Sequence, residues 1–452
     1  MMLRRVLVAN RGEIAVRILR TCRTLGIETV LAVSGDDAGS LPARLADATV
    51  GIGPGATFLD AEAMVAAARA VKAGAIHPGY GFLSESPRLA RACEQAGLVF
   101  IGPTAAQLAA VGDKLAARER AEAAGLPVAP GGRVTAAAQA AGLADQIGWP
   151  VLVKAVGGGG GRGLRPVQRP ADLGPAVARA TAEARAAFGD DRVYLERYLP
   201  RGRHVEVQLL GDGERVIHLG DRDCSVQRRY QKLLEEAPAP LLADPLRAQI
   251  RHAAVAFGKS LGYRGLGTVE FLVDVAQGGF FFLEMNARIQ VEHPVTEAVS
   301  GLDLVAEQIA VAEGRPLRLA QDDAALAGHA IECRINAEDP AAGFRPSPGI
   351  VTRAVFPAGP GIRVDTHLQA GTAVPPGYDS LLAKVIASGR DRAEALARLR
   401  GALARCEIDG VATTTGLHAA LTADPEFGRG GVDTGYLPRL LDRALAATGE
   451  SR

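Results

Sequence analysis

The sequence predicts an α/β protein of several packed domains, the first of them built on a doubly wound parallel sheet. Over about the first hundred residues, short β-branched runs alternate with alanine-rich stretches, a pattern typical of parallel strands joined by helices. The chain has 452 residues, and a single hydrophobic core rarely grows that large, so two to four domains are expected. Strand patterns dominate after residue 204. The fold class is therefore α/β, and α+β when the whole chain is considered.

The N-terminal sheet is expected to start with the strand RVLVAN, followed by a helix from about Arg11. Further strands are expected in ETVLAVS, AIHPGY and LVFIGP, with helices around residues 60–72 and between the last two strands. In open parallel sheets, ligands bind beyond the carboxyl ends of the strands. We therefore expect residues 10–12, 77–81 and 102–103 to face a ligand site.

A small α/β module is expected in the middle section of the chain. Two alanine-rich helices flank the loop LPVAPGG and lead into the strand WPVLVKAV, the glycine-rich residues 157–163, an extended GLRPVQ, a helix and VYLERYL. Strands then dominate (HVEVQLLG, RVIHLGDRDC, GTVEFLVD, GGFFFLEMNAR), with helices at about 244–261 and 302–312. Short strands in a Gly- and Pro-rich region at 341–378 precede helices near 392–405 and 414–423.

Composition narrows the function classes. Charged residues make up 22% of the chain, the formal net charge is +1, and no long block of like charge occurs, so neither a nucleic-acid nor a membrane partner is predicted. The five cysteines form no CxxC pair, and no signal peptide is recognisable, which predicts a cytoplasmic protein. Only six of the 51 basic residues are lysines. Each lysine is therefore a candidate for a place where a compact ammonium is required.

The glycine loop GGGGGRG at residues 157–163 indicates phosphate binding, because glycines let several backbone N–H groups approach phosphate oxygens. A Rossmann turn needs a helix directly after the glycines, whereas GLRPVQRP is extended. A Walker loop would need GK[ST], and the one such triplet, Gly258-Lys259-Ser260, lies inside a helical pattern. A flexible linker is a further alternative. The favoured interpretation is a hairpin loop that folds over a nucleotide, with Lys154 placed to meet its α- and β-phosphates.

A metal site is predicted in the next hairpin. Glu270 lies in GTVEFLVD, while Glu284 and Asn286 lie two residues apart in FFFLEMNAR and so point to the same face. Carboxylate and amide oxygens suit Mg²⁺, which usually takes one or two carboxylates together with substrate phosphates. Salt-bridged or solvated carboxylates are the alternative, although Glu284 follows an apolar run in which an uncompensated charge is costly.

An anion site is predicted directly after the metal ligands. Arg288 could bind a small anion, and Glu292 could take a proton from it; a surface salt bridge between the two is the alternative. Lys232 lies in the cationic stretch DCSVQRRYQKLLEE, for which a solvated face is the alternative. His293 is more readily explained as a structural histidine than as a metal ligand.

The motifs ANRGEIAVRI, AIHPGYGFLSE, KAVGGGGGRG, RDCSVQRRYQK, EEAPAP, EMNARIQVEHPVTE and ECRINAEDP occur in order along the chain. Together they resemble biotin carboxylase, a member of the ATP-grasp superfamily, over essentially the whole sequence. The resemblance implies an ATP-grasp fold with a Rossmann-like N-terminal domain at 1–113, an ATP-grasp region at 114–330 whose mobile lid covers about 131–197, and a mixed α/β C-terminal domain at 331–452.

The resemblance also implies site residues. ATP contacts fall to Lys114, Lys154, Gly160, Gly161, Glu196, Arg197, Tyr198, Leu199, His204, Gln227, Tyr230 and Glu270. Arg197 replaces a common lysine, and Tyr230 stands where many family members have histidine. Two Mg²⁺ or Mn²⁺ ions would be held by Glu270, Glu284 and Asn286. Bicarbonate would lie against Lys232, Arg288, Gln290 and Val291 with Glu292 as general base, and biotin against Arg334 and Tyr80.

The implied reaction is the ATP- and bicarbonate-dependent carboxylation of biotin through carboxyphosphate. None of the four methionines neighbours a lysine, as they would in a biotin-carrier domain, so biotin is expected on a separate carrier protein. The resemblance implies a homodimeric subunit of acetyl-CoA or acyl-CoA carboxylase that acts with a biotin carboxyl carrier protein and carboxyltransferase subunits. Another ATP-grasp ligase, or a catalytically silent nucleotide-binding subunit, is the alternative.

Overall fold

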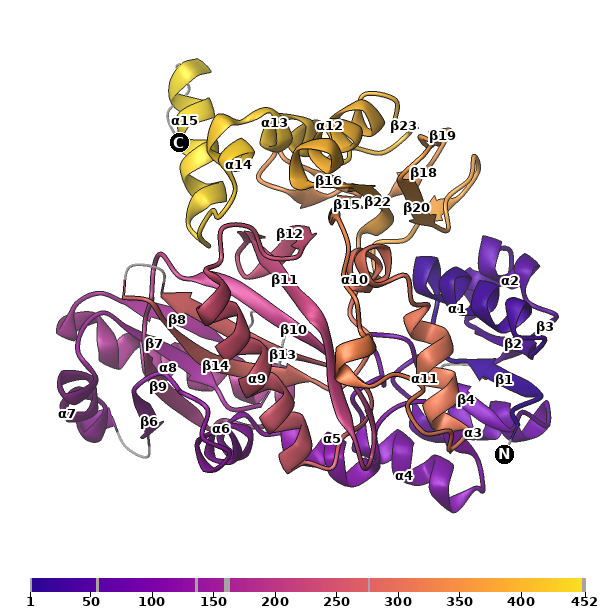
Figure 1. Cartoon of the computed structure of the whole chain (residues 1–452), viewed down its shortest axis with the longest axis horizontal. Helices are drawn as coiled ribbons and strands as arrows, with labels where there is room; N and C mark the ends of the chain where they lie inside the picture. Colours follow the sequence, from indigo (N-terminus) through magenta and orange to yellow (C-terminus); the bar gives the residue numbers. More distant parts are fainter. Residues whose placement is uncertain (1, 54–56, 135–136, 158–162, 275–276, 449–452) are drawn as a thin grey trace.

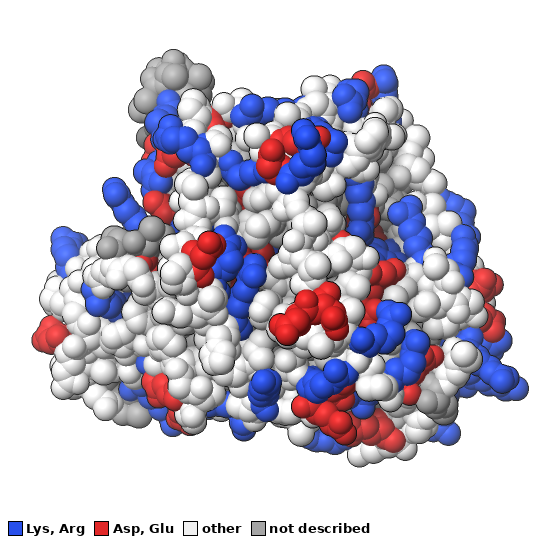
Figure 2. Space-filling model, in the orientation of Figure 1, with Lys and Arg blue, Asp and Glu red and all other residues white. Residues whose placement is uncertain are grey.

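The computed structural model describes residues 2–53, 57–134, 137–157, 163–274 and 277–448. Figure 1 shows the N-terminal elements on one side of a long central sheet, the small module of β6–β9 on the other, and the C-terminal helices above. Within the described ranges, no helix is long and apolar enough to cross a membrane. Basic and acidic side chains are interspersed over the face seen in Figure 2.

The N-terminal residues form the expected parallel sheet, with strand order β3-β2-β1-β4-β5. Its strands are β1 (Arg5–Val8), β2 (Glu28–Val33), β3 (Ala48–Gly51), β4 (Ala75–His77) and β5 (Val99–Phe100). The helical elements between and after them are α1 (Gly12–Thr24), η1 (Gly35–Asp37), α2 (Leu41–Leu45), α3 (Ala61–Ala70), α4 (Pro87–Gln95) and α5 (Ala105–Gly112). Strands β1 and β4 are almost fully buried, as expected of a sheet covered on both faces.

The small module follows α6 (Lys114–Ala123) and has an antiparallel sheet of strand order β6-β9-β7-β8. Its elements are β6 (Gly131–Val134), α7 (Ala137–Ile147), β7 (Val151–Ala155), β8 (Leu164–Val167), α8 (Pro170–Phe188) and β9 (Val193–Arg197). Strands β7 and β8 pair as a hairpin around the glycine loop. The extended segment after the glycines is thus a strand, as the favoured interpretation of the loop requires.

The central sheet is antiparallel and has the order β14-β13-β10-β11-β12-β15-β22-β20. Its strands are β10 (Arg203–Asp212), β11 (Val216–Arg228), β12 (Gln231–Ala237), β13 (Arg264–Asp274), β14 (Gly279–Asn286), β15 (His329–Asn336), β20 (Ile362–Thr366) and β22 (Leu381–Gly389). The intervening helical elements are α9 (Asp244–Ser260), α10 (His293–Ser300), α11 (Leu304–Ala312) and η2 (Gln321–Asp323). Because β12 pairs with β15, one sheet joins the middle part of the chain to its C-terminal part.

The C-terminal part adds short paired strands and helices. The strands are β16 (Glu338–Asp339), β17 (Arg345–Pro346), β18 (Gly349–Ile350), β19 (Arg353–Val355), β21 (Ala373–Val374) and β23 (Glu407–Asp409). The helices are α12 (Arg392–Leu403), α13 (Thr415–Ala423), α14 (Pro425–Arg429) and α15 (Tyr436–Thr448). Helix α12 packs on β22 through a core that includes Leu399 and Val385, which anchors this part on the central sheet.

Candidate active site

The chemistry-bearing side chains gather where neighbouring strands of the central sheet run side by side, and on the segment between β14 and α10. Strand order alone brings together residues that are far apart in the chain. They are His204 and Glu206 on β10, Gln227 on β11, Lys232 and Glu235 on β12, Glu270 on β13, Glu284 and Asn286 on β14, and Arg334 on β15. The sheet is therefore a rigid platform for the candidate site.

Lys232 is the centre of a buried carboxylate cluster. Its Nζ lies 2.5 Å from Glu206 Oε2, 2.7 Å from Glu270 Oε1 and 2.7 Å from Glu292 Oε1, and all three carboxylates are buried. Burial opposes the ammonium charge, but the carboxylates raise the pKa of Lys232 well above its ordinary value. Lys232 therefore does not lie on a solvated face, although residues 229–231 in the turn before it are exposed. The Lys232 ammonium instead lies among three carboxylates, where an anionic substrate could also bind to it.

A fully buried arginine holds Glu206 from the other side. Arg222 Nε donates to Glu206 Oε1, and its other nitrogens donate to Gln208 Oε1 at 2.8 Å, Thr296 Oγ1 at 2.8 Å and Thr268 Oγ1 at 3.1 Å. With its donors satisfied in this way, Arg222 is fixed as a structural cation. Glu206 therefore offers Lys232 a fixed anchor.

Glu292 is shared by two cations. Its Oε1 accepts from Lys232, and its Oε2 accepts from Arg334 Nη2 at 2.9 Å. Burial raises the pKa of the Glu292 carboxyl, but Lys232, Arg334 and Arg222 together hold it well below the ordinary value. Arg334 Nε also donates to Glu235 Oε1 at 2.5 Å. Glu292 is thus a buried carboxylate held between two cations.

Two further carboxyl groups lie in this buried layer. Burial raises the pKa of Glu235 to about 7, although the adjacent Arg334 lowers it. Burial, reinforced by Glu235 and Glu292, raises the pKa of Glu332 well above the ordinary value, and both of its oxygens lack a hydrogen-bond partner among the described residues. Burial thus disfavours the charged form of Glu332, while the charges of Lys384 and Arg334 oppose this shift of its pKa.

The predicted metal ligands share one face of the β13–β14 hairpin. Glu270 lies directly opposite Glu284 in the register, and Asn286 lies two residues further along β14. Asn286 Nδ2 donates to Glu270 Oε1 at 2.9 Å, and Lys114 Nζ lies 3.4 Å from Glu284 Oε2. Two carboxylates and an amide oxygen on a rigid hairpin fit Mg²⁺ or Mn²⁺. The Glu284 side chain is 34% exposed, so an ion there can also contact substrate oxygens.

Two other groups of potential ligands fit a metal less well. His204, Glu206 and Glu270 lie close together, as do Glu206, Cys224 and Glu292. In both groups the Lys232 ammonium already binds two of the carboxylates at 2.5–2.7 Å. A divalent cation would have to displace this ammonium from two carboxylates in either group, whereas on the hairpin the ammonium contacts Glu270 alone, so the hairpin is the better candidate.

Arg288 does not pair with Glu292. Its Nε donates to Glu85 Oε2 at 2.9 Å, its Nη1 to Gln290 Oε1 at 2.8 Å and its Nη2 to Asn286 Oδ1 at 3.0 Å. The surface salt bridge with Glu292 that was the alternative is therefore wrong. Arg288 instead lies between the metal hairpin and the segment that carries Gln290.

The nucleotide candidates on the small module are also paired. Lys154 Nζ donates to Glu196 Oε2 at 2.9 Å, and Arg118 Nη1 donates to Glu196 Oε1 at 3.2 Å. Burial opposes the charge on Lys154, but Glu196 and Tyr194 raise its pKa. The structure thus holds Glu196 on β9 between two cations. A phosphate would share or replace Glu196 as the partner of Lys154.

The remaining nucleotide candidates lie around the ends of β9, β10 and β11. Gln227 Nε2 lies 2.6 Å from His204 Nδ1, and His204 Nε2 lies 2.8 Å from Glu270 Oε2. Burial opposes protonation of His204, but Glu270 raises its pKa. Tyr230, half-exposed in the turn after β11, hydrogen-bonds to Tyr198. Arg197 is exposed and Leu199 half-buried beside them.

Gly160 and Gly161 lie outside the described residues. At the end of the loop, Gly163 has φ +72°, and a Cβ there would lie 2.8 Å from Ala155 Cβ. Its carbonyl oxygen accepts a hydrogen bond from Ala155 N at 3.1 Å. Glycine is therefore required where the loop rejoins β8.

Tyr80, one of the two residues predicted to contact biotin, donates a hydrogen bond from its hydroxyl to Glu13 Oε1. Burial and Glu13 raise the pKa of Tyr80 well above the ordinary value, while the charge of Arg334 opposes the shift. His293 is buried, with Nδ1 2.8 Å from Gln290 O, as expected of a structural histidine.

Sequence reasoning missed several members of the site. Glu206, Arg222 and Glu235 lie within quoted motifs but carry no spacing signal. The scarcity of lysine drew attention to Lys384, although no role was predicted for it. Glu13 gave no signal, because the pairing that explains it is long-range.

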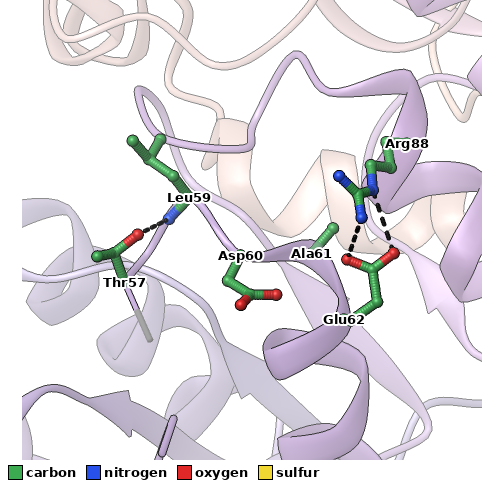
Figure 3. A pocket seen from close by; sticks show the side chains of 6 residues that line it. All are labelled: Thr57, Leu59, Asp60, Ala61, Glu62 and Arg88. Atoms are coloured by element: carbon green, nitrogen blue, oxygen red, sulfur yellow. Dashed lines mark hydrogen bonds and ion pairs between the residues drawn. The ribbon is translucent and has the colours of Figure 1, made fainter. Parts of the chain in front are cut away.

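A surface hollow of about 490 Å³ near the start of α3 is separate from these residues. Thr57, Leu59, Asp60 and Ala61 line it, and Figure 3 shows Arg88 paired with Glu62 at its side. None of the site residues described above lines this hollow.

Comparison with known proteins gives consistent results along the chain. Residues 2–108 match the biotin carboxylase N-terminal domain, residues 113–320 the ATP-binding domain of the carbamoyl-phosphate synthase L chain, and residues 332–439 the biotin carboxylase C-terminal domain. The chain is 48% identical to a biotin carboxylase of Nostoc sp., over 96% of this chain and 99% of the relative. It is 47% identical to a pyruvate carboxylase subunit of Methanothermobacter thermautotrophicus, over 96% of this chain and 90% of the relative.

Solved structures are similar throughout. A biotin carboxylase from Campylobacter jejuni in complex with β,γ-ATP has a TM-score of 0.94 at 43% identity, covering 97% of this chain and 99% of that one. The biotin carboxylase domain dimer of Hydrogenobacter thermophilus 2-oxoglutarate carboxylase, in complex with MgADP, ADP and bicarbonate, has a TM-score of 0.94 at 44% identity, covering 97% and 98%.

Proposed function

The chain belongs to the biotin carboxylase family of ATP-grasp enzymes, and on this premise we propose that it carboxylates biotin on a separate carrier protein with ATP and bicarbonate. One observation carries the proposal: Glu292 is buried between Lys232 and Arg334. The carboxylate proposed to deprotonate bicarbonate therefore contacts two cations. Lys232 is proposed to bind bicarbonate, and Arg334 is proposed to bind the biotin anion.

The proposed mechanism follows from the contacts. Bicarbonate would draw Lys232 and Arg288 toward itself, which relieves Glu292 of a cation and lets its carboxylate take the bicarbonate proton. The bicarbonate oxygen would attack the γ-phosphorus of ATP, which forms carboxyphosphate and releases ADP. Glu270, Glu284 and Asn286 would hold Mg²⁺, which would supply positive charge against the phosphates. Lys154 and Lys114 would bind phosphate oxygens, and the β6–β9 module would close over the nucleotide to exclude water.

The second half of the proposed reaction involves Arg334. Carboxyphosphate would yield CO₂ and phosphate, and the phosphate would take the proton of the biotin ureido nitrogen. The Arg334 guanidinium would stabilise the resulting anion until its nitrogen attacks the CO₂ to form carboxybiotin. This role suits the planar Arg334 guanidinium, which already binds Glu235 and Glu292 at the same time. Tyr80 would lie against the biotin ring system.

We further propose that the chain serves an acetyl-CoA or acyl-CoA carboxylase as a homodimeric component beside a carrier and a carboxyltransferase. The 48%-identical biotin carboxylase, which matches along almost its whole length, supports a separate biotin carboxylase component, while the 47%-identical pyruvate carboxylase subunit supports a 2-oxo acid acceptor. Affinity purification of the native complex, followed by assays with acetyl-CoA and pyruvate, decides between them.

We also propose that the regions 1–113, 114–330 and 331–452 act as domains. The family matches support these bounds, although strand β15 crosses the bound between residues 330 and 331.

The central test measures ADP release with Mg²⁺, ATP and free biotin, with and without bicarbonate. Turnover that needs bicarbonate and rises with biotin supports the proposal. Turnover that needs ammonia and ignores biotin would indicate another ATP-grasp ligase. Nucleotide binding without turnover would indicate a regulatory subunit.

A further inference from the structure

Lys384, on β22, is completely buried where three distant segments of the chain meet. Its Nζ donates to the carbonyl oxygen of Val291 at 2.9 Å and lies 3.2 Å from Glu13 Oε1 and 3.9 Å from Asp365 Oδ2. Glu13 belongs to α1, Val291 to the segment before α10, and Asp365 to the neighbouring strand β20. The Lys384 ammonium therefore links the N-terminal domain, the segment before α10 that carries Val291, and the C-terminal strands.

One contact of Lys384 leads to the proposed base. Val291 and Glu292 share a peptide group, whose carbonyl oxygen belongs to Val291. The bond from Lys384 to this oxygen therefore fixes the backbone from which the Glu292 side chain starts. Because the peptide group is planar, a shift of its oxygen would rotate the Glu292 backbone N–H as well.

The other contact leads to the biotin side. Glu13 Oε1 accepts the hydrogen bond of the Tyr80 hydroxyl, and the same oxygen is the one nearest to Lys384. Glu13 is only 3% exposed, so water does not compete effectively for it. Lys384 therefore fixes the acceptor that orients Tyr80.

The charge on Lys384 persists despite burial. Burial opposes the ammonium form, but Glu13, Glu332 and Asp365 raise the pKa of Lys384 above its ordinary value. A compact ammonium with three donors suits a fully buried position with acceptors in several directions, whereas a planar guanidinium is larger and directs its donors in one plane. This position holds one of only six lysines among the 51 basic residues.

We propose that Lys384 is a positioning residue that holds the bicarbonate-side Glu292 and the biotin-side Tyr80 in a fixed relation, through Val291 and Glu13. This inference rests on the proposed function, because it assigns Glu292 to bicarbonate and Tyr80 to biotin. Neither the metal hairpin nor the Lys154–Glu196 pair is in contact with Lys384 through the bonds described. The arrangement therefore concerns the two small substrates and not ATP.

The first test is Lys384→Met, which removes the ammonium and keeps most of the side-chain volume. The KM values for bicarbonate and free biotin should each rise about tenfold, the loss that one charge-assisted hydrogen bond typically brings. The KM for MgATP should stay within about twofold of the wild-type value, because the nucleotide contacts are separate. Lys259→Met, at an exposed lysine of α9, is the matched control and should change none of these constants.

A double-mutant cycle tests the path to Tyr80. Tyr80→Phe should raise the KM for biotin in the wild-type background and add little in the Lys384→Met background, because the same contact has already been lost. Fully additive effects would show that Lys384 does not act through Tyr80. Such additivity would overturn the proposed link.

Glu13→Gln keeps the inference testable if Lys384→Met does not fold. It retains an acceptor oxygen for Tyr80 but removes the charge that pairs with Lys384, so the KM for biotin should rise more than the KM for bicarbonate. An unchanged KM for biotin, or an equal rise in all three KM values, would overturn the inference. A wild-type protein without bicarbonate-dependent ADP release would instead refute the proposed function itself.

Discussion

Replacing Glu292 by glutamine should abolish bicarbonate-dependent ATP turnover and leave nucleotide binding nearly intact. The change preserves the shape of the side chain and replaces one carboxylate oxygen by an NH₂ group. In the wild-type site, both oxygens accept hydrogen bonds from cations, Lys232 at 2.7 Å and Arg334 at 2.9 Å. An amide can accept from only one of them and must turn N–H donors toward the other.

The cost in folding stability should be moderate, because neither cation is left unpaired. Lys232 retains Glu206 and Glu270, and Arg334 retains Glu235. The loss is then about 2 kcal/mol, as for hydrogen bonds to charged groups, and not the roughly 3–5 kcal/mol of an uncompensated buried charge. The catalytic loss should be larger. Removal of a general base typically lowers the rate by about 10²- to 10⁴-fold, equivalent to about 3–5 kcal/mol in the barrier.

The measurement pairs ADP release at saturating bicarbonate with calorimetric titration of MgADP. Glu307→Gln provides the matched control, since Glu307 is a buried carboxylate on α11 that pairs with the exposed Arg318. That control should lose some thermal stability and keep its turnover. If Glu292→Gln hydrolyses ATP at a rate comparable to wild type in the presence of bicarbonate, Glu292 is not the base.

Three further predictions concern the neighbouring groups. Arg334→Lys should lower carboxylation of free biotin at least about tenfold more than ATP hydrolysis, because a single ammonium nitrogen cannot reproduce the planar guanidinium whose separate nitrogens bind Glu235 and Glu292; equal losses would contradict the role in biotin activation. Because the folded protein holds the Glu235 proton up to about pH 7, the contribution of Glu235 to stability is full below its ordinary pKa and declines as the pH rises through 7. Glu235→Gln should remove that decline, as measured by the thermal unfolding temperature from acidic to alkaline pH. An unaltered pH dependence of the unfolding temperature would contradict this contribution of Glu235. Glu284→Gln should raise the Mg²⁺ concentration for half-maximal turnover about tenfold or more, and an unchanged Mg²⁺ requirement would remove Glu284 from the metal site.

Local patterns predicted those parts of the site that depend on strand alternation. Glu284 and Asn286 share a face because they lie two residues apart on one strand, and the short turn places Glu270 opposite them. The glycine loop was likewise predicted to lie between strands because the segment after it is extended. The doubly wound N-terminal sheet followed from its alternating pattern for the same reason.

Long-range pairings could not be predicted in this way. Glu235 on β12 and Arg334 on β15 meet because these strands are neighbours, and nothing in either segment encodes the order of strands in the sheet. The same holds for Arg288, which lies four residues from Glu292 but pairs with Glu85. The helical spacing of Arg288 and Glu292 was misleading because the segment between β14 and α10 is not helical.

The scarcity of lysine was an informative signal because of what an ammonium does in this fold. Of the six lysines, Lys72 and Lys259 are exposed, whereas the other four pair with acidic side chains in or beside the candidate site. Lys232 shows the physical reason. Three carboxylates approach its nitrogen from different directions at 2.5–2.7 Å. A compact ammonium with rotatable donors satisfies this geometry, whereas a planar guanidinium does not. In a chain with so few lysines, a lysine surrounded by several acceptors reflects the geometry of those acceptors.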